Sequence, residues 1–281
     1  MINRRTNGMN GKYRPIELDP LSPRSIVLSV LLGTHPPSMP VGRLLDVTSL
    51  FGITAGTSRT ALSRMVTQGE LAQDEGVYRL SGRLLERQAQ QDAGRQERPT
   101  TWDGTWWFVA VLADRRSVAA RRAFRSRATG ARLGELRPDT WLRPANIDVP
   151  ADLADALMTR GPLVSGDDVA LARRLWDLDA IDATARSLGS ALRSTSTELG
   201  VDAPDSALTD AFVQLAACQR FLRTEPQLPE SLDPSRSSIE LRAVYADVVV
   251  TFQQRLAAFF ERRRSTANAP RVGTGVPSVQ A

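Results

Sequence analysis

The chain carries FGITAGTSRTALSRMVTQGEL at residues 51–71 and continues with AQDEGVYRLS to residue 81, and this stretch decides the fold of its N-terminal part. Apolar residues before it recur at helical spacing and predict a helix over 41–51. Gly52 supplies a tight turn, and Thr54 can cap the next helix by accepting a hydrogen bond from a free amide. Gly76 then turns a hairpin. This order predicts a winged helix-turn-helix.

The second of these helices has two chemically different faces. Its inward face is apolar and consists of Ala61, Leu62, Met65 and Val66. Its outward face and the wing supply the predicted DNA-binding residues, which are Thr57, Arg59, Thr60, Ser63, Arg64, Thr67 and Arg79. Arginine can bind guanine in a bidentate way, and serine and threonine can contact bases or the backbone. An ordinary solvated amphipathic helix would show the same pattern, so the helix alone leaves both interpretations open.

Several motifs of the chain together resemble a known family. The run RTALSRMVTQGEL, with FGIT before it and YRLS after it, resembles the winged-helix domain of the PaaX-like repressors of phenylacetic acid catabolism. That family's middle domain is similar to WDGTWWFVAVL (102–112) and GARLGELRPDTWLRP (130–144). Two landmarks of its C-terminal domain are similar to RLWDLDAIDA (174–183) and FLRTEPQLPESL (221–232). The motifs stand in family order.

The hydrophobic pattern and the resemblance together predict a mixed α+β, mostly α fold. A helix that begins near Pro23 opens the winged domain. A β-α-β-β order then suits a ferredoxin-like domain, which in the family resembles the Cas2 fold, and a helical domain follows. The expected parts are a disordered arm (1–20), the winged helix-turn-helix domain (21–85), a polar linker (86–101), the ferredoxin-like (Cas2-like) middle domain (102–166), the C-terminal helical domain (167–264) and a disordered tail (265–281).

Individual elements follow from apolar spacing within these parts. The middle domain is predicted to hold strands at 106–112, 131–137, 140–144 and 163–165, with a helix over about 116–128. The C-terminal domain is predicted to begin with one long amphipathic helix through Leu171 and Leu192, in whose bundle Trp176 packs. Prolines at 226, 229 and 234 separate its last two helices.

Charge is distributed unevenly along the 281 residues. The net charge of +5 arises from 36 basic and 31 acidic residues. Residues 1–98 carry a net +4, residues 99–150 a net +4, and residues 151–281 a net −3. The positive half coincides with the proposed DNA-binding part, as counterion release would favour. Arginines also crowd the predicted middle helix and suit either phosphates or plain solvent, namely Arg115, Arg116, Arg121, Arg122, Arg125 and Arg127.

The remaining composition argues against several other classes of protein. Cys218, the only cysteine, has no internal disulfide partner and reads as an inert core thiol. His35, the only histidine, reads as a loop residue rather than a catalytic base. No signal-peptide core and no apolar run of about 18 residues is present, so we expect a cytoplasmic protein without a membrane span.

The resemblance implies a homodimeric repressor of a phenylacetate-type catabolic operon. Its expected partners are double-stranded operator DNA and a small-molecule acyl-CoA effector, such as phenylacetyl-CoA, that releases the DNA. The residues show no catalytic constellation, so we expect that the protein is not an enzyme and binds neither a cofactor nor a metal. The sequence does not indicate which residues line the effector pocket.

Alternative functions remain open at this point. A Cas2-like metal-dependent nuclease would need carboxylates at a strand end, and Asp114 stands alone between VLA and two arginines, which makes a poor metal site. The family often reads closer to FDIPE where this chain has VLADRR. This departure allows a regulator of the same fold that answers to a different effector. A protein-interaction adaptor that has lost DNA binding is a further alternative.

Overall fold

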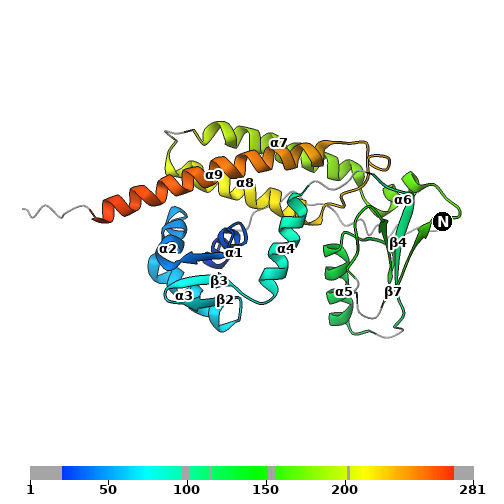
Figure 1. Cartoon of the computed structure of the whole chain (residues 1–281), viewed down its shortest axis with the longest axis horizontal. Coiled ribbons are helices and arrows are strands. Elements are labelled where there is room, and N and C mark those ends of the chain that lie inside the picture. The colour runs from blue at the N-terminus through cyan, green and yellow to red at the C-terminus, as the bar shows by residue number, and fades with distance from the viewer. Residues whose placement is uncertain are drawn as a thin grey trace, which may run out of the picture.

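The computed structural model describes residues 21–96, 101–113, 116–150, 153, 156–200 and 203–268. The expected arm at 1–20 and the tail beyond residue 268 lie outside these ranges. The described part is a mixed α+β fold that is mostly helical, with one three-stranded and one four-stranded sheet (Figure 1). None of its helices combines the length and the apolar character that crossing a bilayer requires.

The N-terminal module holds three helices around a small sheet. Its elements are α1 (Pro23–Leu32), β1 (Ser38–Pro40), α2 (Val41–Leu50), α3 (Ala55–Thr67), β2 (Leu71–Asp74) and β3 (Val77–Leu80). The strands pair antiparallel in the order β1-β3-β2, and Gly76 turns the hairpin at a φ of +76°. The helix predicted at 41–51 and the hairpin are thus confirmed. Strand β1 was not expected, because its segment is rich in proline, but an edge strand tolerates proline.

Helix α4 (Arg83–Arg95) occupies the beginning of the segment that the sequence predicted as a linker. It lies between the N-terminal module and α8 (Asp205–Thr224) (Figure 1). Gln88 is buried and donates from Nε2 to the carbonyl oxygens of Leu31, Leu32 and Thr34 at 3.0–3.4 Å. The linker prediction is therefore wrong for residues 86–95, which are helical. Polar side chains thus make much of the contact of α4, including Arg95, whose Nε donates to Gln219 of α8 at 2.6 Å. An apolar pattern cannot indicate such contacts.

The middle part of the chain forms a four-stranded antiparallel sheet and one helix. The elements are β4 (Thr105–Val111), α5 (Val118–Gly130), β5 (Gly134–Arg137), β6 (Thr140–Pro144) and β7 (Ala156–Pro162), and the strand order is β5-β6-β4-β7. The first three strands and the helix were predicted to within three residues at each end. The strand predicted at 163–165 is wrong, since the strand ends at Pro162. Strand β7 lies at the exposed edge of the sheet, so its sequence lacks the alternation of buried apolar residues by which a strand can be predicted.

The two faces of this sheet pack against different parts of the chain. Side chains alternate along β4, as a strand requires. Val109 packs with Phe124 of α5, whereas Trp106 packs with Ala172 of α6 (Asp168–Leu175). The indole nitrogen of Trp106 also donates to Asp168 at 2.8 Å. The sheet is therefore covered on both sides, by α5 on one face and by the start of the C-terminal part on the other.

The C-terminal part is a bundle of long helices. After α6 come α7 (Leu178–Glu198), α8 and α9 (Ser237–Asn268). The single long helix predicted through Leu171 and Leu192 is wrong, because the chain is extended at Trp176 and Asp177 caps α7 by accepting from the amide of Ala180 at 3.0 Å. The Trp176 indole closes over Gly134, where an added Cβ would lie only 3.0 Å from the ring.

Two further predictions concern the last helix. The proline-rich segment between α8 and α9 is non-helical, as predicted. Helix α9 itself continues to Asn268, beyond the expected start of the tail at 265.

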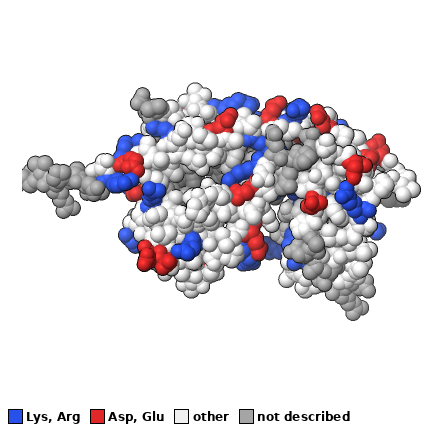
Figure 2. Space-filling view, viewed as in Figure 1, with Lys and Arg blue, Asp and Glu red and all other residues white. Residues whose placement is uncertain are grey.

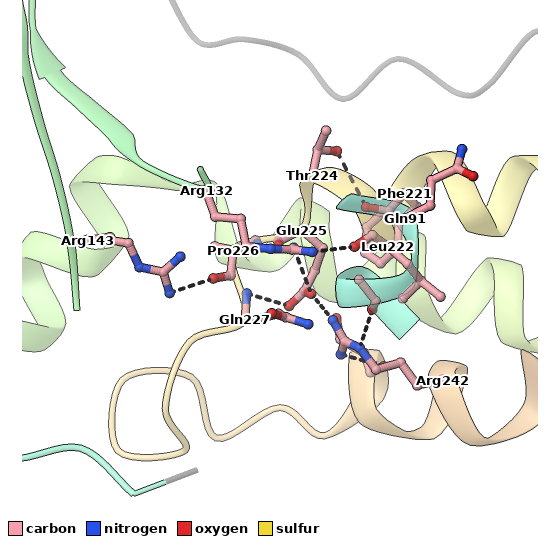
Figure 3. A network of polar contacts seen from close by, with 12 residues as sticks. Gln91, Arg132, Arg143, Phe221, Leu222, Thr224, Glu225, Pro226, Gln227 and Arg242 are labelled. Carbon is pink, nitrogen blue, oxygen red and sulfur yellow. Dashed lines mark hydrogen bonds and ion pairs between the residues drawn. The ribbon is translucent and has the colours of Figure 1, made fainter. Parts of the chain in front are cut away.

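A buried polar network holds the ends of several helices together (Figure 3). At its centre the Glu225 carboxylate pairs with Arg242 of α9, and Arg132 Nη1 lies 3.9 Å from Glu225 Oε2. Arg242 Nε donates to the carbonyl oxygen of Gly94 at the end of α4 at 3.1 Å. Arg143 of β6 donates to the carbonyl oxygen of Pro226 at 3.4 Å. This Glu225 network therefore links α4, the middle sheet, the end of α8 and helix α9.

We expect Glu225→Gln to lower the free energy of unfolding by about 3–5 kcal/mol, because it leaves buried arginines without their carboxylate. Urea unfolding followed by circular dichroism measures this loss. The control is Glu135→Gln, which breaks the partly exposed pair with Arg125 and should cost about 0–1 kcal/mol. Equal losses for the two variants would contradict the central role of Glu225.

The cysteine gives a second prediction. Cys218 is fully buried on α8, and burial raises the pKa of its thiol to about 12. Since the thiolate is the reactive form, the native protein should not react with Ellman's reagent at about pH 8. The same titration in guanidinium chloride should release one equivalent of thiol. Rapid reaction of the folded protein would show that this part of α8 opens readily.

Candidate nucleic-acid interface

Helix α3 is fixed by its apolar side against the core of the N-terminal module. Leu62 and Met65 are 0% and 1% exposed, and they belong to the same core as Ile26 of α1 and Leu44 of α2. Ala61 and Val66 of the predicted inward face are half-buried. The burial of one side leaves the other side of α3 on the surface of the molecule.

The turn between α2 and α3 sets the angle at which α3 leaves the module. Gly52 has a φ of +70°, which favours glycine. Thr54 caps α3, since its hydroxyl accepts from the amide of Thr57 at 3.3 Å, as the sequence predicted. Ser58 donates to the hydroxyl of Thr48 at 2.8 Å, and both residues are buried. This hydrogen bond joins α2 to α3 and was missed, because serine and threonine read as surface residues in a sequence.

All seven predicted DNA-binding residues are exposed in the structure. Six of them lie on α3 and Arg79 lies on strand β3 of the hairpin. The hydroxyls of Thr60 and Thr67 donate to the carbonyl oxygens of Gly56 and Ser63 at 3.0 and 3.1 Å. Their oxygen lone pairs stay available, so these threonines can accept from a base amino group without losing a hydrogen bond.

The arginines of the surface differ in their freedom. Arg59 and Arg64 form no ion pair with any residue in the described part of the chain. Arg79 lies 3.4 Å from Asp74 across the hairpin, and both side chains are at least half exposed. Such a surface pair contributes little, so a phosphate can replace the carboxylate at small cost. The guanidinium groups of α3 and the wing can therefore all turn toward a ligand.

One carboxylate lies close to this surface. The hydrogen bond from Arg24 lowers the pKa of Glu70, which stands between α3 and β2. Glu70 is therefore ionised at neutral pH and fixes the start of α1 to the base of the wing. Arg24 is thereby engaged and is not a free contact for DNA.

The structure brings a further basic group next to α2 that sequence analysis did not single out. Arg263 of α9 donates to the Ser49 hydroxyl at 2.9 Å and lies 3.4 Å from Asp46. Arg43 of α2 lies over the ring of Phe260, with 5.3 Å between guanidinium carbon and ring centroid. The run ERRR at 261–264 was the only signal of this group in the sequence. The C-terminal end of α9 thus supports the first helix of the pair.

The arginines predicted at residues 115–127 do not form one free basic surface. Arg121, Arg122 and Arg127 are exposed on α5, whereas Arg125 pairs with Glu135 at 2.8 Å and Arg116 pairs with Asp139. On the face that Figure 2 shows, acidic and basic side chains alternate without one large patch of a single sign. Asp114, the candidate metal ligand, and Arg115 lie outside the described residues.

Comparison with known proteins bears on this geometry. The model of a family described as PaaX-like protein matches residues 22–84, which include α1, α2, α3 and the hairpin. The structure is similar to that of the uncharacterized protein Rv0674 from Mycobacterium tuberculosis, with 35% identity, a TM-score of 0.65 and coverage of 85% of this chain and 99% of that one.

The chain belongs to the PaaX-like family. No curated protein gives a significant match to the chain. Membership of the PaaX-like family indicates a role in transcription regulation and agrees with the resemblance seen in the sequence motifs.

In this PaaX-like protein we expect Thr54→Ala to lower the free energy of unfolding by about 1 kcal/mol, because α3 loses its N-terminal cap. Thr54→Ser keeps the accepting oxygen and should stay within a few tenths of a kcal/mol of the parent protein. Chemical unfolding followed by far-ultraviolet circular dichroism compares the two variants. The same loss for alanine and serine would mean that the threonine methyl group, and not the cap, stabilises the helix.

Proposed function

We propose that this protein is a DNA-binding transcriptional regulator with a winged helix-turn-helix at its N-terminus. In this proposal α3 enters the major groove, α2 crosses above it, and the β2–β3 hairpin is the wing. The observation that carries the proposal is the face of α3. Its hydroxyl and guanidinium groups are exposed together, while the opposite side of the same helix is buried. Family membership supports the same function.

We further propose that the middle domain is ferredoxin-like and related to the Cas2 fold. The strand order β5-β6-β4-β7, with every neighbouring pair antiparallel, supports this assignment, as does the β-α-β-β order of its first elements. The helical layer of this domain is α5, and α6, which follows β7 in the chain, covers the opposite face of the sheet. This domain packs against α6 and α8 at the end of the C-terminal bundle that lies away from α2 and α3 (Figure 1).

The proposed regulator acts as a homodimeric repressor of an aromatic-acid catabolic operon. Two-fold symmetry would place two copies of α3 about 34–36 Å apart, or a multiple of this distance, on a palindromic operator. An aryl-CoA such as phenylacetyl-CoA would release the DNA by binding more tightly to the state that cannot bind DNA. A tenfold loss of operator affinity needs about 1.4 kcal/mol of such a preference.

A fluorescence-anisotropy titration tests the regulator function directly. The protein is titrated into labelled DNA from upstream of its own operon and into a scrambled duplex of equal length, at several salt concentrations. We expect tighter binding to the upstream DNA and a steep fall in affinity as salt rises, since phosphate contacts release counterions. Equal affinity for both duplexes, or no binding at low salt, would remove the proposal.

Arg64→Ala should weaken operator binding by about 1–3 kcal/mol, which is roughly 5- to 150-fold, if this arginine reads a base. If Arg64 contacts only a phosphate, affinity should fall equally for operator and scrambled DNA, and the salt slope should shrink by about one. The matched control is Arg174→Ala, on the exposed side of α6 and far from α3 (Figure 1). An unchanged affinity for Arg64→Ala would exclude α3 as the recognition helix.

A further inference from the structure

A cavity of about 360 Å³ lies between the N-terminal module and the C-terminal bundle. Helices α1 and α4 form one side of it, and α8 and α9 form the other. Its volume falls in the range of pockets that bind small molecules, about 300–1,000 Å³. We call it the interhelical cavity. Its lining borders the common core through Val30, Phe212 and Leu215, and it contains no residue of α3, so DNA contact does not account for it.

One wall of the interhelical cavity is apolar. Side chains from both long helices form this wall, including Phe212 and Leu215 of α8 and Val249, Phe252 and Leu256 of α9. Phe212 and Phe252 lie with their ring centroids 6.4 Å apart. An aromatic or aliphatic group placed here would be removed from water against rings and branched side chains, which is favourable.

The other part of the lining is strongly basic. Arg87 of α4 and Arg220 and Arg223 of α8 all line the cavity, and no ion pair links any of them to an acidic residue in the described ranges. Burial lowers the pKa of both Arg87 and Arg223, and repulsion by neighbouring arginines lowers them further. Arginine stays charged in proteins all the same. The cluster is therefore a group of repelling cations that an anion would stabilise.

A glutamine adds an unused acceptor to the same lining. Gln91 of α4 is only 5% exposed, and its Oε1 has no hydrogen-bond donor. Its neighbour Gln219 is satisfied, because its Oε1 accepts from Arg95 Nε at 2.6 Å and from the Tyr245 hydroxyl at 2.8 Å. A buried acceptor without a donor is costly.

We propose that the interhelical cavity binds an organic anion with an apolar body, whose negative group meets Arg87, Arg220 and Arg223 and whose body meets the phenylalanine wall. The proposal rests on the proposed function, in that this ligand would be the effector of the regulator. A free carboxylate with an aromatic or aliphatic body has this chemistry. An acyl-CoA has it as well, with the apolar body in its neutral acyl end and the negative charge on the phosphates of CoA. The cavity has room for either apolar body.

The position of the cavity explains how a bound ligand would affect the DNA-binding surface. Ser29 and Val30 of α1 and Gly33, directly after this helix, line the cavity, and α1 packs directly against α3. A ligand that fills the space between α1 and the bundle changes the preferred distance between the module and α8–α9. Binding then favours one orientation of α3 over another, and the coupling holds in both directions.

The first test uses a matched pair of fluorescent probes and no DNA. The anionic probe is 1-anilinonaphthalene-8-sulfonate, and its neutral analogue is N-phenyl-1-naphthylamine. We expect the double variant Arg220→Gln/Arg223→Gln to bind the sulfonate at least tenfold more weakly and the neutral analogue with nearly unchanged affinity. Ala216→Trp, which fills the cavity from α8, should abolish the binding of both probes.

The controls are placed outside the cavity. Arg174→Gln and Ala170→Trp change exposed residues of α6 in the same way and should leave the binding of both probes unchanged. Circular dichroism and thermal unfolding identify any variant that fails to fold. Sulfonate binding that is indifferent to both the arginine pair and Ala216→Trp, in folded protein, would overturn the proposal.

A competition experiment then separates the sources of the ligand. Phenylacetate and decanoate represent free acids, phenylacetyl-CoA represents thioesters, and CoA alone carries phosphates without an apolar acyl group. Displacement of the sulfonate probe by the acids assigns a free carboxylate, and displacement by the thioester alone assigns an acyl-CoA. Displacement by CoA alone with equal strength, or by none of the four compounds, would overturn the proposed ligand class.

The same variants distinguish failure of this proposal from failure of the regulator function. If the probes bind as expected but the protein does not bind operator DNA, the cavity is a ligand site and the proposed function is wrong. If operator binding is intact and the probes do not enter the cavity, the regulator function stands and the ligand site is wrong.

Discussion

The architecture depends on one buried carboxylate. Among the described residues, Glu225 is the one buried acidic side chain. Arginines from the middle sheet region and from α9 contact its carboxylate or the backbone carbonyls next to it. Charges removed from water must be compensated, because an unpaired one costs several kcal/mol. This requirement fixes where α8 ends, where α9 begins and how closely α4 approaches. At Gly94 the approach is so close that an added Cβ would lie 2.8 Å from the carbonyl oxygen of Leu222.

The sequence predicted those parts of the fold whose stability comes from local apolar spacing. Helix α2, the threonine cap of α3 and the β2–β3 hairpin follow from residues a few positions apart, and they occur as predicted. The outward face of α3 was predictable for the same reason, since one helix has one buried side.

The misjudged elements are those whose contacts are polar or distant in the chain. Helix α4 is held by Gln88 and by Arg242, which is 148 residues away from the Gly94 carbonyl it contacts. The break between α6 and α7 depends on Trp176 packing over a glycine of another element. Strand β7 exists because β4 offers it an edge. The cavity was equally hidden, because its arginines come from α4 and α8 and become neighbours only after folding.

Helix α9 has a mechanical consequence for the whole molecule. It is anchored near one end by Arg242 in the buried network and near the other by Arg263 against α2. At 1.5 Å per residue the two anchors are about 30 Å apart along a straight helix. A tilt of only about 5° at the inner anchor would swing the outer one by roughly 3 Å, which is comparable to half a helical turn. A small change in packing around Arg242 can thus become a displacement of several ångströms at Arg263, which contacts α2.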